Sequence, residues 1–255
     1  MWCGVVVDPG VFALGLIVLL AFLVEATAGF GATVVTVTLA ALWLPITEIL
    51  AIFIPVNLLL SVWLAWRYRA SIDLPLLIRR ILPLMILGTG LGVGLRGRLD
   101  ASLGLFFFGT FIVVLSAVEL RRGPSETAPL SPGIAGLGVG AAGVVHGLFA
   151  CGGPMLVWVV GREVKDKTRF RATLSAVWLL LGLGLLTELW VGGAVGELSL
   201  IRSLFLLPSL MLGLHLGEKL HHAVAPSAFR RGVYQLLLVM GLVLLGRSTG
   251  ILALI

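Results

Sequence analysis

Charged residues are scarce in this 255-residue chain. Asp, Glu, Lys and Arg make up 12% of it, whereas a soluble domain normally carries about 25%. A water-soluble surface cannot be built from so few charges, which excludes an ordinary soluble domain. Hydrophobic residues make up 59% and the mean hydropathy is +1.14. We therefore expect the lipid bilayer to be the solvent for most of the protein.

Cysteine and catalytic motifs are scarce as well. The two cysteines, Cys3 and Cys151, form no CxxC pair and no metal-ligand spacing, which argues against a disulfide framework and a metal site. The apolar runs hold no nucleophile–base set, so we expect no catalytic residues, no cofactor and no enzyme. An ATP-binding loop is absent, and any pumping must then use an ion gradient or a separate partner.

The net charge of +6 is explained by membrane topology. The Lys and Arg side chains lie in short clusters between apolar runs, as topology signals do, so no nucleic-acid partner is expected. The first run follows Asp8 and Pro9 rather than a basic segment. Residues 11–28 are therefore expected to belong to the mature protein and not to a cleaved signal.

Long hydrophobic runs dominate what is present. A membrane-spanning helix needs about 20 mostly apolar residues, and most of the runs are long enough. The sequence thus predicts an all-α, polytopic integral membrane protein. The ten runs cover approximately residues 11–28, 31–45, 49–66, 79–95, 102–120, 133–149, 152–161, 172–191, 203–218 and 232–250.

Two runs, 31–45 and 152–161, are short, and each follows a glycine-rich break at residues 29–31 or 151–154. Glycine accepts backbone angles that other residues resist, and Pro154 suits the first turn of a helix. Each break is therefore expected to be the tip of a helical hairpin, re-entrant or broken, that enters the membrane and turns back.

The two halves of the chain resemble each other. A polar linker at 123–132, rich in Pro and Ser, separates residues 1–122 from residues 133–255. We predict an internal duplication, with each repeat contributing one hairpin and three transmembrane helices to one integrated domain. Residues match at a spacing of 121 (Gly31 with Gly152, Ala51 with Ala172) and of 125 (Pro83, Gly88, Gly92 and Leu95 with Pro208, Gly213, Gly217 and Leu220).

The basic residues predict the topology. If each hairpin returns to its starting side, fourteen of the eighteen Lys and Arg face one side, which is then the cytoplasm. Both termini are consequently expected in the periplasm. Each half holds an odd number of crossings, so the second repeat is predicted to be inverted relative to the first, as in many secondary transporters.

The two tips form the predicted binding site. A helix that begins inside the membrane directs unpaired N–H groups and the positive end of its dipole into the cavity, which suits a small anionic substrate. Inversion is expected to bring both tips near the membrane midplane. The predicted substrate-binding residues are Gly29, Gly31, Ala32, Thr33, Asn57, Cys151, Gly152, Gly153 and Met155.

Other polar and small residues receive different predictions. Glu25 and His146 precede the two tips at a spacing of 121, and because ionisable residues inside a membrane mark function, both are candidates to carry a coupling proton. The alternative is a structural hydrogen bond across the repeat interface. Thr36 and Thr38 are expected to bond back to their own helix. The glycines of the 125-residue spacing are expected to permit close helix packing.

These features resemble a known family. Ala28-Gly29-Phe30-Gly31 and Ala150-Cys151-Gly152-Gly153-Pro154 open the two halves, and each half later carries Pro-x4-Gly-x3-Gly. In this arrangement the chain resembles the sulfite exporter TauE/SafE family from about residue 11 onward. The resemblance implies ion- or proton-coupled export of a sulfur-containing anion, such as sulfite, sulfoacetate or a related organosulfonate, across the bacterial inner membrane.

Two alternatives to a carrier stay open. A membrane-embedded thiol-redox or assembly protein would need a reactive pair from Cys3 and Cys151, which lie far apart in the sequence. A passive anion channel fits the same pattern of runs and tips. Assembly as a homodimer is also compatible with the sequence.

Overall fold

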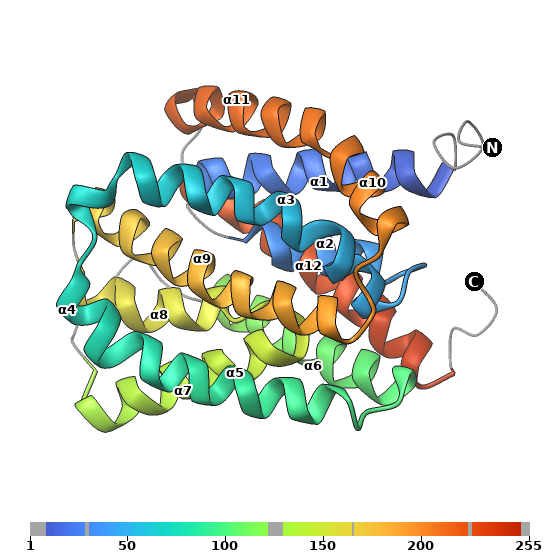
Figure 1. Cartoon of the computed structure of the whole chain (residues 1–255), viewed down its shortest axis with the longest axis horizontal. Helices are drawn as coiled ribbons and strands as arrows, with labels where there is room; N and C mark the ends of the chain where they lie inside the picture. Colours follow the sequence, from blue (N-terminus) through green and yellow to red (C-terminus); the bar gives the residue numbers. More distant parts are fainter. Residues whose placement is uncertain (1–8, 29–30, 122–129, 165, 224–225, 251–255) are drawn as a thin grey trace. The chain divides into compact units, whose positions relative to one another are not determined.

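The computed structural model describes residues 9–28, 31–121, 130–164, 166–223 and 226–250, which form helices and contain no β-strand (Figure 1). The first half forms α1 (Pro9–Ala28), α2 (Ala32–Ala40), α3 (Ile46–Arg67), η1 (Arg69–Ser71), α4 (Leu74–Leu76), η2 (Leu77–Ile81), α5 (Leu82–Arg96) and α6 (Ala101–Arg121). The second half forms α7 (Pro132–Phe149), α8 (Gly153–Glu163), α9 (Lys167–Val191), α10 (Glu197–Phe205), α11 (Leu207–Ala223) and α12 (Pro226–Ser248).

The helices of the two halves follow the same order of lengths. A long helix (α1, α7) precedes a short one (α2, α8), then a long one (α3, α9), a composite one (α4 to α5, α10 to α11) and a final long one (α6, α12). This order agrees with the predicted duplication. Inversion of the second repeat stays a prediction.

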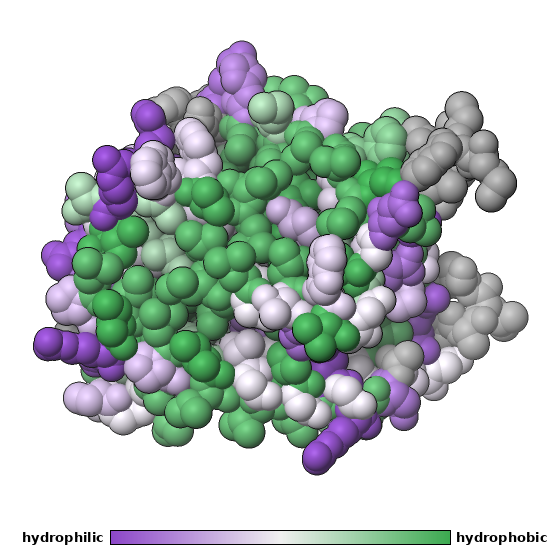
Figure 2. Space-filling view, in the orientation of Figure 1, coloured by the Kyte–Doolittle hydropathy of each residue, from purple (hydrophilic) through white to green (hydrophobic). Residues whose placement is uncertain are grey.

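Six helical segments among the described residues are long and apolar enough to cross a membrane. Large hydrophobic side chains cover their outer faces, with Leu137 77% exposed and Val191 82% exposed. In Figure 2, hydrophobic residues cover most of the visible face and hydrophilic ones gather near its margins. The predicted all-α, polytopic fold is confirmed. The segments are Ile46–Arg67, Leu74–Arg96, Ser102–Arg121, Pro132–Phe149, Thr168–Val191 and Glu197–Gly217.

The two helices that follow the glycine-rich breaks are short, as expected. α2 has 9 residues and α8 has 11, which at about 1.5 Å per residue gives about 14 Å and about 17 Å. The hydrocarbon core is about 30 Å thick. Neither helix can therefore span it.

The chain forms two compact units, and each contains segments from both halves. The first unit comprises residues 1–53, 99–124 and 197–255, and the second comprises 54–98 and 125–196. α1, α2, α6, α11 and α12 belong to the first unit; α5, α7, α8 and α9 belong to the second. A unit is therefore not the same thing as a repeat.

In the second unit, the backbones of α5 and α7 touch through glycines. A Cβ atom on Gly88 would lie 2.3 Å from the Gly140 carbonyl oxygen, and one on Gly92 would lie 2.2 Å from the Val144 carbonyl oxygen. Real Cβ contacts are not this short, so only glycine fits. α5 and α7 accordingly run side by side in Figure 1.

The first unit repeats this contact between α1 and α11. A Cβ atom on Gly213 would lie 2.6 Å from the Leu19 carbonyl oxygen, and one on Gly217 would lie 2.8 Å from the Leu23 carbonyl oxygen. Leu19 and Leu23 lie 121 residues before Gly140 and Val144. The two contacts thus match in register, and the predicted packing role of these glycines is confirmed.

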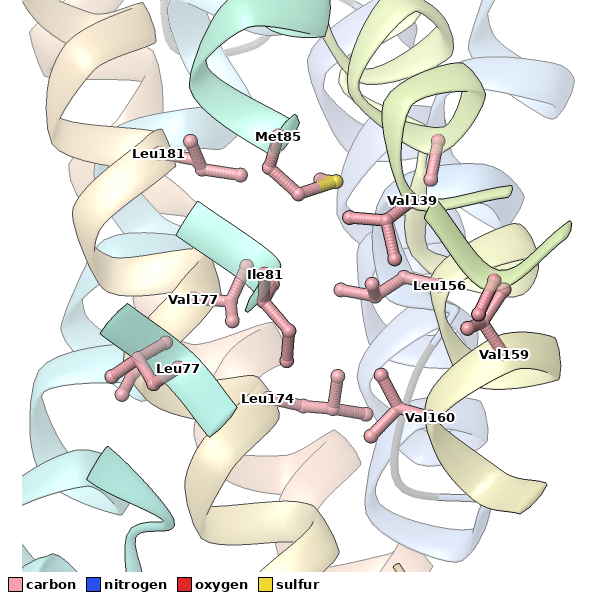
Figure 3. Close-up of a cluster of buried hydrophobic side chains, with 13 residues drawn as sticks. Leu77, Ile81, Met85, Val139, Leu156, Val159, Val160, Leu174, Val177 and Leu181 are labelled. Atoms are coloured by element: carbon pink, nitrogen blue, oxygen red, sulfur yellow. The ribbon is translucent and has the colours of Figure 1, made fainter. Parts of the chain in front are cut away.

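A buried apolar cluster holds α8 in the second unit (Figure 3). Leu156, Val159 and Val160 of α8 lie among side chains of η2, α5, α7 and α9. Lipid tails are as apolar as these side chains, so close packing rather than exclusion from water favours the cluster. The cluster comprises Leu77, Ile81, Met85, Ala135, Val139, Ala142, Leu156, Val159, Val160, Leu174, Ala176, Val177 and Leu181.

The glycine contact predicts a difference between two substitutions in one helix. Gly92→Ala forces α5 away from α7, and overpacking of this kind costs about 1–3 kcal/mol. Gly94→Ala meets nothing within 4 Å and is expected to leave stability unchanged. Thermal unfolding of the purified variants in detergent measures both. Equal unfolding temperatures for the two variants would contradict the packing role.

Candidate functional site

The second hairpin returns to the side from which it starts. Gly88 meets Gly143 and Gly92 meets Gly147, so α5 and α7 run in the same direction and α7 begins near η2, just before α5. At the end of α8, Glu163 pairs with Arg80 of η2 at 2.8 Å. Both ends of the α7–α8 hairpin therefore lie at the Arg80 end of this unit, as expected for a hairpin that turns back.

The last turn of α7 lies beside the last turns of α5. Gly92, which meets Gly147, is one turn before Arg96, where α5 ends. The Arg96 guanidinium donates a hydrogen bond to the Gly147 carbonyl oxygen at 3.3 Å. Beyond the end of α7 the chain turns back, because Gly152 lies beside Ala142 and Gly153 lies beside Trp178, in the middle of α9. The midplane depth of the tip stays a prediction.

The backbone at the tip is set by two residues. Ala150 adopts a left-handed conformation with φ 55°, which ends α7. A Cβ atom on Gly152 would lie 2.2 Å from the Ala142 carbonyl oxygen, so only glycine fits before α8. The Leu156 N–H is bonded to the Gly152 carbonyl oxygen at 3.1 Å. The earlier N–H groups, those of Gly153 and Met155, have no partner within the helix.

Two aromatic rings lie beside the start of α8. His146 is 5% exposed, and neither ring nitrogen makes a hydrogen bond of normal geometry to a described residue, although the backbone of Ala150 lies close to the ring. Its ring stacks on Trp178 of α9 with centroids 5.7 Å apart. A Cβ atom on Gly153 would lie 3.6 Å from the Trp178 ring. Buried polar groups are normally hydrogen-bonded, so this imidazole indicates a place for a ligand.

Asn57 belongs to the same unit. Its Oδ1 atom is buried without a hydrogen-bond partner in the described part of the chain. The next residue, Leu58, lies 2.9 Å from the position of a Cβ atom on Gly182, one turn beyond Trp178 on α9. Asn57 is therefore next to the part of α3 that packs against α9, and its substrate-binding role stays a prediction.

The first hairpin differs at the equivalent position. Gly31 has φ 112° and precedes α2, a conformation that favours glycine. The Ala32 N–H donates to Oε2 of Glu25 at 3.0 Å, so the chain's own carboxylate binds the start of α2. Ala32 was expected to offer this N–H to the substrate, and the structure engages it internally instead. Thr33 is half-buried in the same turn, and Gly29 lies outside the described residues.

The two tips are thus chemically different. One hydrogen bond of Glu25 lies within its own hairpin. His146 occupies the equivalent place in the second hairpin, where no side chain caps α8. The start of α2 is therefore bound by the Glu25 carboxylate, whereas the start of α8 lies beside the His146 imidazole.

The prediction for Thr36 and Thr38 is wrong. Both are fully buried in α2, and neither hydroxyl has a hydrogen-bond partner within the described residues. The expected bonds back to the helix backbone are therefore missing. Nothing in the first unit explains the two unpaired hydroxyls.

Neither a metal site nor a thiol pair emerges from the residues that the structure places. They contain no group of three or more metal-ligating side chains. Cys151 is a free, buried thiol at the second tip. Cys3 lies outside the described residues, so the thiol-pair alternative stays open.

Comparison with known proteins decides the family. The family model of the sulfite exporter TauE/SafE matches residues 14–244, a range that includes both hairpins. The chain belongs to the sulfite exporter TauE/SafE family. Its resemblance to TauE/SafE proteins, predicted from the tips and the glycine pattern, is thereby confirmed.

A TauE/SafE chain with this fold is a multi-pass inner-membrane protein of a transporter family. A protein of Comamonas testosteroni, described as "Probable inner membrane transporter protein TsaS", is 31% identical over 163 residues. The match covers 64% of this chain and 68% of that protein. No solved structure matches the chain.

Proposed function

We propose that this protein is a secondary transporter that exports a sulfur-containing oxyanion across the inner membrane. The observation that carries the proposal is the uncapped start of α8 beside His146, a buried imidazole that makes no hydrogen bond of normal geometry to a described residue. Backbone N–H groups and an imidazole together supply hydrogen-bond donors to a negatively charged ligand. The preference for sulfur rests on membership in the sulfite exporter family.

The shape of the tip suits a small oxyanion. Gly153 and Met155 supply N–H groups, and Pro154 supplies none, so few donors remain for the ligand. His146 adds one donor as a neutral imidazole and a second when it is protonated. The face of Trp178, which stacks on His146, offers an apolar surface to the carbon part of an organosulfonate. Sulfite and sulfonates carry several oxygens, so each of these separate donors can bind a different oxygen of the same ligand.

Glu25 is our candidate for the residue that carries the coupling proton. Its carboxylate accepts the Ala32 N–H at the start of α2, where the helix dipole favours negative charge. Protonation removes that charge and weakens the attachment of α2 to α1. Protonation of Glu25 would therefore change the conformation of the first hairpin. Coupling to an ion gradient requires such a link between proton binding and conformation.

Binding by the second tip predicts a response to anions that depends on His146. Purified protein should unfold at a higher temperature in sulfite or an organosulfonate, because a ligand stabilises the state that it binds. His146→Gln should lose most of this shift, since it removes the imidazole. His215→Gln is the matched control, because His215 is exposed on α11 in the other unit. An equal shift for wild type and both variants would contradict the site.

The coupling role predicts a change in pH dependence. Glu25→Gln keeps an acceptor for the Ala32 N–H but cannot take up a proton at physiological pH. We expect transport by this variant in proteoliposomes to lose its dependence on the pH gradient while counterflow, which needs no net coupling, continues. A pH dependence equal to that of the wild type would rule out Glu25 as the proton carrier.

A further inference from the structure

A cationic side chain lies beside the tip of the α7–α8 hairpin. Arg96, the last residue of α5, donates to the carbonyl oxygen of Gly147, the residue after His146, at 3.3 Å. Its other terminal nitrogen pairs with Oε2 of Glu188 on α9. The Arg96 side chain is 15% exposed. Glu188 lies 92 residues from Arg96 in the sequence.

The helix dipoles stabilise Arg96 and destabilise Glu188. Arg96 ends α5, Gly147 lies in the last turn of α7, and Glu188 lies in the last turn of α9. Helix C-termini carry partial negative charge, which favours a cation and disfavours an anion. Arg96 is therefore held in place without Glu188, whereas any anion at this position, the Glu188 carboxylate included, depends on Arg96.

We propose that Arg96 is a second anion-binding position beside the tip, and that Glu188 occupies it between transport events. The Arg96 Nη2 group pairs with one carboxylate oxygen of Glu188, while Nη1 bonds to the Gly147 carbonyl oxygen. The same Nη2 group can hold an oxygen of a sulfite or sulfonate group, because a guanidinium binds carboxylates and other oxyanions alike. Arg96 bonds to the residue that follows His146, which places it beside the end of α7 that leads into the tip. The inference rests on the proposed function, since it extends the same site.

The opposite end of the unit offers a matched control pair. Arg80 and Glu163 also form one ion pair, at 2.8 Å, with Arg80 51% exposed. Exposed pairs contribute little to stability, and this one joins the end of α8 to η2, away from the tip of the hairpin. Its neutralisation changes the charge of the protein in the same way without touching the proposed position.

The test measures the half-saturating sulfite concentration of the full-length protein by thermal shift. Glu188→Gln removes the competing charge, and we expect it to lower that concentration about fivefold or more. Arg96→Gln should raise it by a similar factor, and the double variant should follow Arg96→Gln, because Glu188 acts only through Arg96. Glu163→Gln and Arg80→Gln should stay within about twofold of the wild type.

Each outcome decides between the alternatives. Should Arg96→Gln fail to fold, Arg96→Lys keeps the charge but lacks the fork, and a higher half-saturating concentration still supports the proposal. If Glu188→Gln leaves this concentration unchanged while the wild type saturates normally, the pair is structural and the inference is wrong. If the wild type responds to no anion at all, the proposed function falls together with the inference.

Discussion

The backbone contact between α5 and α7 determines where the second tip lies. Gly88 and Gly92 sit against Gly143 and Gly147 with no room for a Cβ atom, and this fixes how far α7 reaches along α5. Any larger residue would push the helices apart and move the tip. The start of α8, His146 and Arg96 all take their positions from this contact, since Arg96 bonds to Gly147 itself. The glycine contact between the two helices thereby sets the positions of the candidate binding groups.

The two repeats use one backbone plan for two chemical purposes. In the first, Glu25 binds the start of α2; in the second, His146 stands at the equivalent place and nothing caps α8. A helix terminus inside a membrane needs a partner for its N–H groups. The first hairpin contains its own, which shows that this geometry accepts a carboxylate. The second hairpin, on our proposal, obtains its partner from the substrate.

Much of the fold follows from the sequence because it rests on local patterns. Run lengths predicted the spanning helices, and glycine spacing predicted the contacts of Gly88 and Gly213 in register. The site was harder to predict. The bond from Ala32 to Glu25 depends on the left-handed conformation of Gly31, and the pair of Arg96 with Glu188 joins residues that are 92 positions apart. Such long-range and conformational details leave no periodic signal.

The central claim is that the N–H groups at the start of α8 bind the transported anion. The most direct measurement is NMR of full-length protein labelled with ¹⁵N-glycine in nanodiscs and titrated with sulfite. Our account predicts that the amide resonances of Gly152 and Gly153 shift saturably, while those of Gly88 and Gly213, which lie in helix contacts, do not move. Unchanged resonances of Gly152 and Gly153 at sulfite concentrations that saturate transport would contradict it.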